Sequence, residues 1–303
     1  MRRAAAALAT GGSVVLSVAV LSGCGGHSTS APPTTTTAAH PTFAYDASQP
    51  LDTIDRGVVS SSRRVSVHDV SYASGSNRVP AFIVEPRRKG RLPGVVLVHG
   101  SGGDRSELLQ RAIALAQLGA VAMTITEPST LNPAPTAATI GALLRQTHAS
   151  TIADVVAVRR AADLLVSLPD VNPARLGYLG WSGGAKTGAF VAASDPRFRA
   201  LALLSAGADP VSAFAAAAPA SERALVVSVL GSVDPLAYVA RARPGSLLLE
   251  DGTHDAIVPH DALENMIRSA PRGTVVRWFD AEHELNDAAY HSAFGWLLRK
   301  LEQ

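Results

Sequence analysis

The chain has 303 residues and nearly balanced charge, with 27 Lys and Arg against 25 Asp and Glu and a formal net charge of +2. No basic stripe and no basic cluster with interleaved aromatic residues stands out along the sequence, which argues against a nucleic-acid partner. Cys24 is the only cysteine, so an intramolecular disulfide and a cysteine nucleophile in the folded domain are both excluded.

The first residues have the pattern of an export signal. Arg2 and Arg3 precede an apolar stretch over residues 4–21, in the order of a positive n-region and an h-region. The stretch closes on Leu-Ser-Gly-Cys, ending at Cys24, which resembles the lipobox of bacterial lipoproteins. That resemblance implies removal of residues 1–23, a lipid on Cys24 and attachment of the exported protein to the outer face of the bacterial cell membrane. The alternative is an uncleaved transmembrane anchor, which would be marginal as a span and would also place the domain outside the cytoplasm.

Residues 24–55 form a segment rich in Pro, Thr, Ser and Ala. Such a composition buries too little apolar surface to offset its ordering entropy, which predicts a tether between the membrane and the domain. Alternatively, the part around Phe43 and Tyr45 is an irregular arm that lies on the domain. Residues 56–303, roughly 250 residues, are enough for one α/β domain with a large core.

Strand and helix patterns alternate along this domain. The first two strand patterns flank the turn residues Ser-Gly-Ser-Asn and predict a hairpin. Helical spacing follows at residues 106–118 and, with one amphipathic face, at 152–168. The alternation predicts a mostly parallel eight-stranded sheet with helices on both faces and with reactive groups at the carboxyl ends of the strands. The predicted strands are residues 65–72, 79–84, 95–98, 120–126, 176–179, 201–204, 247–249 and 275–279.

A candidate nucleophile follows the strand at 176–179. Gly-Trp-Ser-Gly-Gly at residues 180–184 lies between a predicted strand and a predicted helix, and this GxSxG pattern resembles the nucleophile elbow of the α/β-hydrolase superfamily. Small neighbours let strand and helix approach closely enough for such a turn to present Ser182. The other interpretation is a glycine-rich turn in which a serine caps a helix.

A serine hydroxyl needs a base, and the superfamily order of nucleophile, acid and base places that base after Ser182. We expect the base to be His283, because it lies in a loop just past the last predicted strand. The other candidates are His254, His260 and His291, of which His291 falls in a helical pattern and the first two flank the acid loop.

The acid that orients the base is expected at Asp255. Its segment Gly-Thr-His-Asp-Ala-Ile-Val-Pro resembles the acid loop of α/β-hydrolases, in which an aspartate after the seventh strand is followed by an apolar residue and proline. Asp209 and Asp251 are rival acids. For Asp234, which precedes a proline, we expect a helix cap.

The residues His-Gly-Ser-Gly-Gly at 99–103 follow the strand at 95–98. The resemblance implies that this loop directs a backbone N–H at a developing oxyanion, which makes Ser101 one donor and Gly183, after the nucleophile, the other. His99 resembles the family's structural histidine, which braces the loop and transfers no proton.

Together these motifs resemble the dienelactone-hydrolase-like and acyl-esterase branch of the superfamily over residues 62–301, although dienelactone hydrolases proper have a cysteine nucleophile. The resemblance implies an α/β-hydrolase fold and a serine esterase that forms an acyl-enzyme, with thioesters or amides as alternative substrates. An acyltransferase of the same fold and a non-catalytic surface module are the rival functions.

No cofactor is expected, and the histidines show no metal-ligand spacing such as HExxH. The expected substrate is a small-molecule or lipid-like acyl compound, and nothing in the sequence indicates an oligomeric state. Residues 127–151 are expected to form a lid or rim. Lys186 and Arg105, near the expected mouth, either meet an anionic substrate or are solvated.

Overall fold

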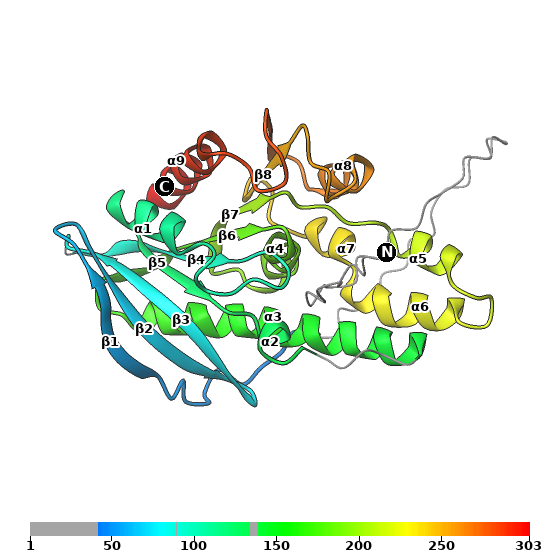
Figure 1. Cartoon of the computed structure of the whole chain (residues 1–303), viewed down its shortest axis with the longest axis horizontal. Coiled ribbons are helices and arrows are strands. Elements are labelled where there is room, and N and C mark those ends of the chain that lie inside the picture. The colour runs from blue at the N-terminus through cyan, green and yellow to red at the C-terminus, as the bar shows by residue number, and fades with distance from the viewer. Residues whose placement is uncertain (1–41, 89, 134–138) are drawn as a thin grey trace, which may run out of the picture.

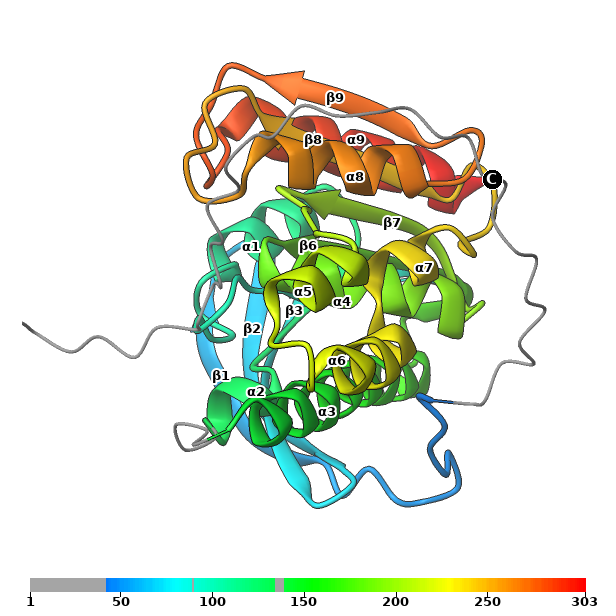
Figure 2. The same ribbon diagram turned by 90° about the vertical axis from the view of Figure 1, so that its right-hand side faces the viewer.

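The computed structural model describes residues 42–88, 90–133 and 139–303. The predicted signal peptide, Cys24 as the expected site of a lipid, and most of the predicted tether lie outside these residues. The described chain forms one nine-stranded sheet in the order β1-β2-β3-β5-β4-β6-β7-β8-β9, covered by helices on both faces (Figures 1 and 2). The predicted mostly parallel α/β architecture is therefore confirmed, with one strand more than the eight predicted.

The opening strands run antiparallel to their neighbours. They are β1 (Ile54–Ser61), β2 (Val65–Ser74) and β3 (Asn77–Pro86), and β2 and β3 form the predicted hairpin around Gly75. The additional strand is β1, which pairs with β2 at the edge of the sheet. Its residues are exposed on both faces, so it lacks the apolar alternation by which a half-buried strand is recognised in a sequence.

The remaining strands supply the parallel part of the sheet. All seven residues of β4 are buried, as expected of a strand covered on both faces. The parallel strands are β4 (Leu92–Val98), β5 (Val121–Ile125), β6 (Val171–Trp181), β7 (Phe198–Leu204), β8 (Leu247–Gly252) and β9 (Val275–Phe279).

Two apolar clusters pack the helices onto the sheet. One face carries α1 (Leu109–Gln117) and α9 (Asp287–Glu302). The other carries α3 (Ile140–Ser167), α4 (Gly183–Ser194), α7 (Pro235–Val239) and α8 (His260–Ser269). Short helices α2 (Pro128–Leu131), α5 (Val211–Ala217) and α6 (Arg223–Leu230) and a 3-10 turn (Gly231–Val233) complete the described elements.

Helix α3 begins at Ile140, twelve residues before the predicted start at 152. Thr139 caps it, with Oγ1 accepting the N–H of Ala142 at 3.2 Å. The added turns pack against α5 and α6 through a small cluster that includes Leu144 and Val226. Because these turns cover helices and not the sheet, their apolar pattern does not continue the stripe of the later turns. None of the described helices is long and apolar enough to span a membrane.

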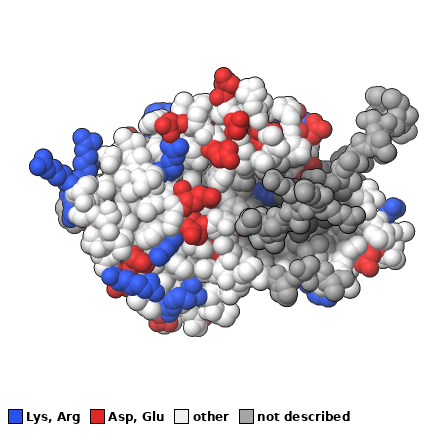
Figure 3. Space-filling model, viewed as in Figure 1, with Lys and Arg blue, Asp and Glu red and all other residues white. Residues whose placement is uncertain are grey.

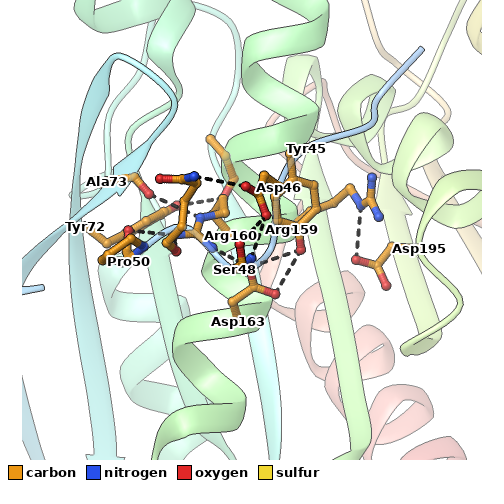
Figure 4. Close-up of polar contacts among 12 residues, drawn as sticks. Tyr45, Asp46, Ser48, Pro50, Tyr72, Ala73, Arg159, Arg160, Asp163 and Asp195 are labelled. Atoms are coloured by element: carbon orange, nitrogen blue, oxygen red, sulfur yellow. Dashed lines mark hydrogen bonds and ion pairs between the residues drawn. The ribbon is translucent and has the colours of Figure 1, made fainter. Parts of the chain in front are cut away.

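The chain from residue 43 onward lies on the domain. Phe43 is buried, with its ring 5.5 Å from that of Phe190 and 5.2 Å from that of Tyr238. The Tyr45 hydroxyl donates to the carboxylate of Asp163 at 2.9 Å (Figure 4). Among the described residues, the core runs from Phe43 to Leu301, and a chain that lacks residues 1–24 keeps all of these residues.

Candidate active site

Ser182 lies in a strained turn between β6 and α4. Its backbone has φ 54° and ψ −111°, a conformation that L side chains rarely adopt, and its N–H donates to Leu204 O at 2.8 Å. The turn depends on a close approach between helix and strand, because a Cβ on Gly184 would collide with the carbonyl oxygen of Val98. A strained turn between a strand and a helix is the geometry expected of a nucleophile elbow.

Three side chains that are far apart in the sequence meet at this turn. Ser182 Oγ lies 2.9 Å from His283 Nε2, and His283 Nδ1 lies 2.8 Å from Asp255 Oδ2. They follow β6, β9 and β8, whose carboxyl ends share one edge of the sheet. The hydrogen bonds form a continuous Ser–His–Asp chain in which the histidine can accept the serine proton.

The Asp255 carboxylate is held by backbone groups on the side away from the histidine. Its Oδ1 accepts the N–H groups of Ile257 and Val258, each at 2.8 Å. The side chain is only 1% exposed. These donors fix the carboxylate and leave Oδ2 to orient the imidazole.

The backbone of His283 is fixed by two donors that sequence reasoning missed. Its carbonyl oxygen accepts the indole N–H of Trp181 at 2.8 Å and the hydroxyl of Ser205 at 2.7 Å. Ser205 is fully buried just past β7 and has φ 51°. Trp181 directly precedes Ser182 in the sequence, whereas no sequence signal distinguishes Ser205.

The loop after β4 lies against the start of α4. The N–H of Gly184 donates to His99 O at 2.9 Å, and a Cβ on Gly183 would lie only 2.8 Å from the backbone nitrogen of Ser101. Gly183 is the first residue of α4, so its N–H has no partner within the helix. The N–H groups of Ser101 and Gly183, the expected oxyanion donors, therefore lie on neighbouring segments beside Ser182.

No family model and no curated protein matches the chain. Among solved structures, it is similar to acetyl xylan esterase 1 from Thermoanaerobacterium sp. (TM-score 0.68, 15% identity, 84% of this chain and 89% of that one). It is also similar to an acetyl xylan esterase from Paenibacillus sp. (0.68, 18%, 82% and 89%). A third is a provisionally named dienelactone hydrolase from Klebsiella pneumoniae (0.58, 17%, 79% and 99%).

The chain has the α/β-hydrolase fold. Within this fold, the His99 side chain holds the loop after β4 in place through two backbone contacts. Its Nε2 accepts the N–H of Glu127 at 3.0 Å, and its Nδ1 lies 2.7 Å from Gly100 O, so the two partners require the neutral tautomer with the proton on Nδ1. Burial also lowers the pKa of His99. Both partners are backbone groups, which leaves His99 no bond to the Ser182 hydroxyl.

The rival acids do not reach His283. Asp251 is buried at the end of β8, where burial raises the pKa of its carboxyl to about 7. Asp209 is exposed beyond β7. Asp234 is the cap expected from the sequence, since its Oδ1 accepts the N–H of Leu236 at 2.9 Å at the start of α7.

The rival histidines are engaged elsewhere. His254 Nε2 lies 2.8 Å from Asp280 Oδ1, and both side chains are exposed. His260 stacks on Trp278, with the ring centroids 5.1 Å apart. His291 is exposed on α9.

Arg105 and Lys186 have different surroundings. Arg105 donates to both oxygens of Asp69, at 2.6 and 3.1 Å, and its guanidinium lies over the ring of Phe82. These contacts attach the loop after β4, which carries Arg105, to β2 and β3. Lys186 follows Ser182 by one helical turn on α4, and it is exposed to solvent.

Two buried carboxyl groups lie behind the turn at Ser182: Glu127 begins the expected rim segment, and Asp154 lies on α3, just beyond the end of that segment. Glu127 Oε1 accepts the hydroxyl of Thr187 at 2.7 Å, and Asp154 Oδ1 accepts the N–H of Ser129 at 2.9 Å. Burial raises the pKa of Glu127 well above its usual range and that of Asp154 to about 6. The described residues contain no group of three or more His, Cys, Asp or Glu placed to hold a metal ion.

Proposed function

We propose that the chain is a serine hydrolase that cleaves carboxylic esters through an acyl-enzyme on Ser182. The observation that carries this proposal is the pair of hydrogen bonds from Ser182 to His283 and from His283 to Asp255, at 2.9 and 2.8 Å. The strained backbone at Ser182 supports it, because such strain is found where a side chain must be presented to a ligand.

In the first half-reaction, Ser182 Oγ attacks the ester carbonyl carbon while His283 Nε2 accepts the hydroxyl proton. Asp255 stabilises the imidazolium that forms and keeps Nδ1 protonated. The N–H groups of Ser101 and Gly183 receive the negative charge on the carbonyl oxygen. Collapse of the tetrahedral intermediate transfers the proton from His283 to the departing alcohol.

In the second half-reaction, water replaces the alcohol. His283 removes a proton from the water as it attacks the acyl carbon, and the same two N–H groups stabilise the second tetrahedral intermediate. Collapse of this intermediate breaks the bond between the acyl carbon and Ser182 Oγ, His283 returns its proton to Oγ, and the free acid leaves. No step draws on a cofactor or a metal ion.

For the substrate, we propose a small acyl ester. Two of the similar structures are named acetyl xylan esterases, which makes acetate esters the first to test. Exposed Lys186 near the nucleophile further suggests comparing neutral with negatively charged leaving groups.

We also propose that Cys24 carries a lipid that anchors the protein to the outer face of the bacterial membrane. The support is the arrangement of two arginines, an apolar stretch and Leu-Ser-Gly-Cys at the N-terminus. Labelled palmitate should be incorporated into the full chain in bacteria and be lost in Cys24→Ser. Equal incorporation in both would remove Cys24 as the attachment site.

The test of the hydrolase is labelling with a fluorophosphonate, together with turnover of p-nitrophenyl acetate and butyrate, for a chain lacking residues 1–24. We expect Ser182→Ala to lose both labelling and turnover, with rates lower by at least about 1,000-fold. Ser76→Ala, in the exposed β2–β3 turn, is the matched control and should retain both. A well-folded wild type that neither labels nor turns over would favour a binding module, and label outside Ser182 would exclude the triad.

An acyltransferase is separated from a hydrolase by its products. With an added alcohol acceptor, a hydrolase still releases mainly the free acid, whereas an acyltransferase releases mainly the new ester. Chromatography of the products distinguishes the two.

A further inference from the structure

Exposed arginines gather at the edge of the sheet formed by the amino ends of its parallel strands. This edge is opposite the carboxyl edge, which carries the candidate active site. Arg63 and Arg64 lie in the turn between β1 and β2, and Arg87, Arg88 and Arg91 lie between β3 and β4; all five are exposed. The two connections are distant in the sequence, but the register of the β2–β3 hairpin brings them together. Val65, at the start of β2, pairs with the last residue of β3. We call these five residues the arginine corner.

The arginine corner surrounds a hollow at the end of a helix. An open surface depression of about 340 Å³ is lined by Arg64, Arg87 and Arg88 and by residues 116–119, at and just after the C-terminal end of α1. Arg87 is fixed by a hydrogen bond from Nη2 to Ser61 Oγ at 2.6 Å. Leu118, at the rim, has 55% of its surface exposed. The hollow thus combines three guanidinium groups with one exposed apolar side chain.

The same edge carries further positive charge. Exposed Arg199, Arg243 and Arg272 lie at or before the starts of the parallel strands β7, β8 and β9. At this edge Asp170, which precedes β6, accepts the N–H of Gly90 at 3.3 Å through its Oδ1. Two further carboxylates behind the edge are engaged with other arginines. Asp163 bonds to Arg160, and Asp195 bonds to Arg159 (Figure 4). Both carboxylates also bond to Arg197, and the side chain of Asp195 is only 2% exposed.

The edge that carries Ser182 has the opposite charge. Exposed acidic residues follow the carboxyl ends of β4, β7, β8 and β9: Asp104, Asp209, Asp261, Asp280, Glu282 and Glu284. Figure 3 shows Lys and Arg gathered at the left-hand end, where Figure 1 draws the β1–β2 turn, and Asp and Glu over the upper part. At about 3.3 Å per residue, the strands separate the two edges by roughly 20 Å.

We propose that the arginine corner, together with Leu118, binds the phosphate groups of anionic phospholipids in a membrane surface. Guanidinium groups bind phosphate through paired N–H donors, and an apolar side chain among them can enter the interface between headgroups and acyl chains. A single-stranded nucleic acid fits less well, because such sites stack bases on aromatic rings and the exposed large hydrophobic residues of the described chain are all aliphatic.

This contact orients the molecule. With the arginine corner on the membrane, the carboxyl edge with Ser182 faces away from the lipid, and anionic headgroups repel the acidic residues around it. The orientation itself does not depend on the proposed function. Only the statement that the edge facing away from the lipid is catalytic rests on that function. Substrate would then arrive from the aqueous side and not from the plane of the membrane.

The test measures co-sedimentation of the chain lacking residues 1–24, so that no lipid anchor contributes, with phosphatidylcholine vesicles with and without phosphatidylglycerol. We expect binding only to the phosphatidylglycerol vesicles and weaker binding as salt is added. The variant R63Q/R64Q/R88Q should bind about 100-fold more weakly, or roughly fivefold for each guanidinium removed. Thermal melting and esterase turnover establish that it is folded.

The matched control is R145Q/R223Q/R268Q, which removes the same charge from exposed arginines on α3, α6 and α8. It should bind like the parent chain. Equal loss in both variants would mean that net charge alone drives binding and would overturn the proposal. So would equal binding to both kinds of vesicle, or equally tight binding to duplex DNA.

The orientation has its own readout. Turnover of water-soluble p-nitrophenyl acetate should be unchanged when saturating phosphatidylglycerol vesicles bind the protein. A several-fold fall would show that the mouth faces the membrane and would overturn the orientation. Because binding is measured without turnover, an inactive protein that binds through the arginine corner would contradict the hydrolase and leave the membrane contact standing.

Discussion

Asp251 is a buried carboxyl group beside the candidate triad. It accepts a backbone hydrogen bond from Ala206, and its other oxygen, Oδ1, has no partner among the described residues. Burial, with smaller contributions from Asp255 and Glu250, raises its pKa from 3.8 to about 7. The folded chain therefore holds this proton over a range in which the unfolded chain has lost it. The contribution of Asp251 to stability therefore falls as the pH rises from about 4 to 7.

We expect Asp251→Asn to stabilise the protein at about pH 8 by roughly 1 to 3 kcal/mol, because it removes a buried charge without changing the shape of the side chain. The gain should shrink towards about pH 5, where the wild-type carboxyl is protonated in the fold. Urea unfolding at the two pH values measures the difference. Asp280→Asn, on an exposed side chain, is the control and should change little. A gain that does not depend on pH would contradict the raised pKa.

The sequence predicts the three residues of the Ser–His–Asp chain because each directly follows a recognisable strand. Ser182, Asp255 and His283 need only the order of the strands and the sharing of one sheet edge to be brought together. Ser205 also follows a strand, yet its role depends on a positive φ and on a hydroxyl directed at the His283 carbonyl. Neither property produces a recognisable pattern in the local sequence, so the role of Ser205 can be identified only from the structure.

Gly184 allows the start of α4 to pack closely against the end of β4. A Cβ at Gly184 would meet the carbonyl oxygens of Val98 and His99, which belong to a buried strand end and cannot withdraw. Gly184→Ala should therefore destabilise the fold by about 1 to 3 kcal/mol. It should also lower turnover, because a shift of α4 moves Ser182 and Gly183 together.

Gly231→Ala is the control for that variant. Its backbone has φ −60° and ψ −26°, and an added Cβ would meet nothing within 4 Å. Chemical denaturation should find this variant as stable as the wild type or more stable by about 0.4 to 1 kcal/mol. Equal destabilisation by both alanines would refute close packing as the reason for Gly184.

Errors in the predicted elements have physical causes. β1 was not predicted because its exposed residues carry no alternation, and it exists because β2 offers it an unpaired edge. Helix α3 was predicted short because its first turns pack on α5 and α6, which face different residues from those that face the sheet. Both elements are defined by neighbours that lie elsewhere in the chain, whereas the buried strands are defined by their own apolar residues.

For the molecule as a whole, the boundary between tether and domain is the point at which sequence composition is least informative. The segment from Phe43 to Leu51 is short and polar, but it packs the Phe43 ring against two aromatic rings of the core and supplies hydrogen-bond acceptors to a buried guanidinium. Arg160, whose side chain is 4% exposed, donates to the carbonyl oxygens of Gln49 and Pro50 at 2.8 and 2.9 Å. The hydrogen bond from Ala73 N to Leu51 O, at 2.7 Å, then joins the arm to β2.

Removing this arm should cost far more than removing the residues before it. We expect chains 25–303 and 42–303 to unfold at the same urea concentration, because they share every described contact. Chain 52–303 loses the Phe43 ring and leaves the Arg160 guanidinium short of two acceptors, so its free energy of unfolding should fall by at least about 3 kcal/mol. Equal stability of all three chains would instead mean that the domain begins after residue 51 and that the packed arm contributes nothing. The 42–303 chain is the control for loss of the residues predicted to form a tether.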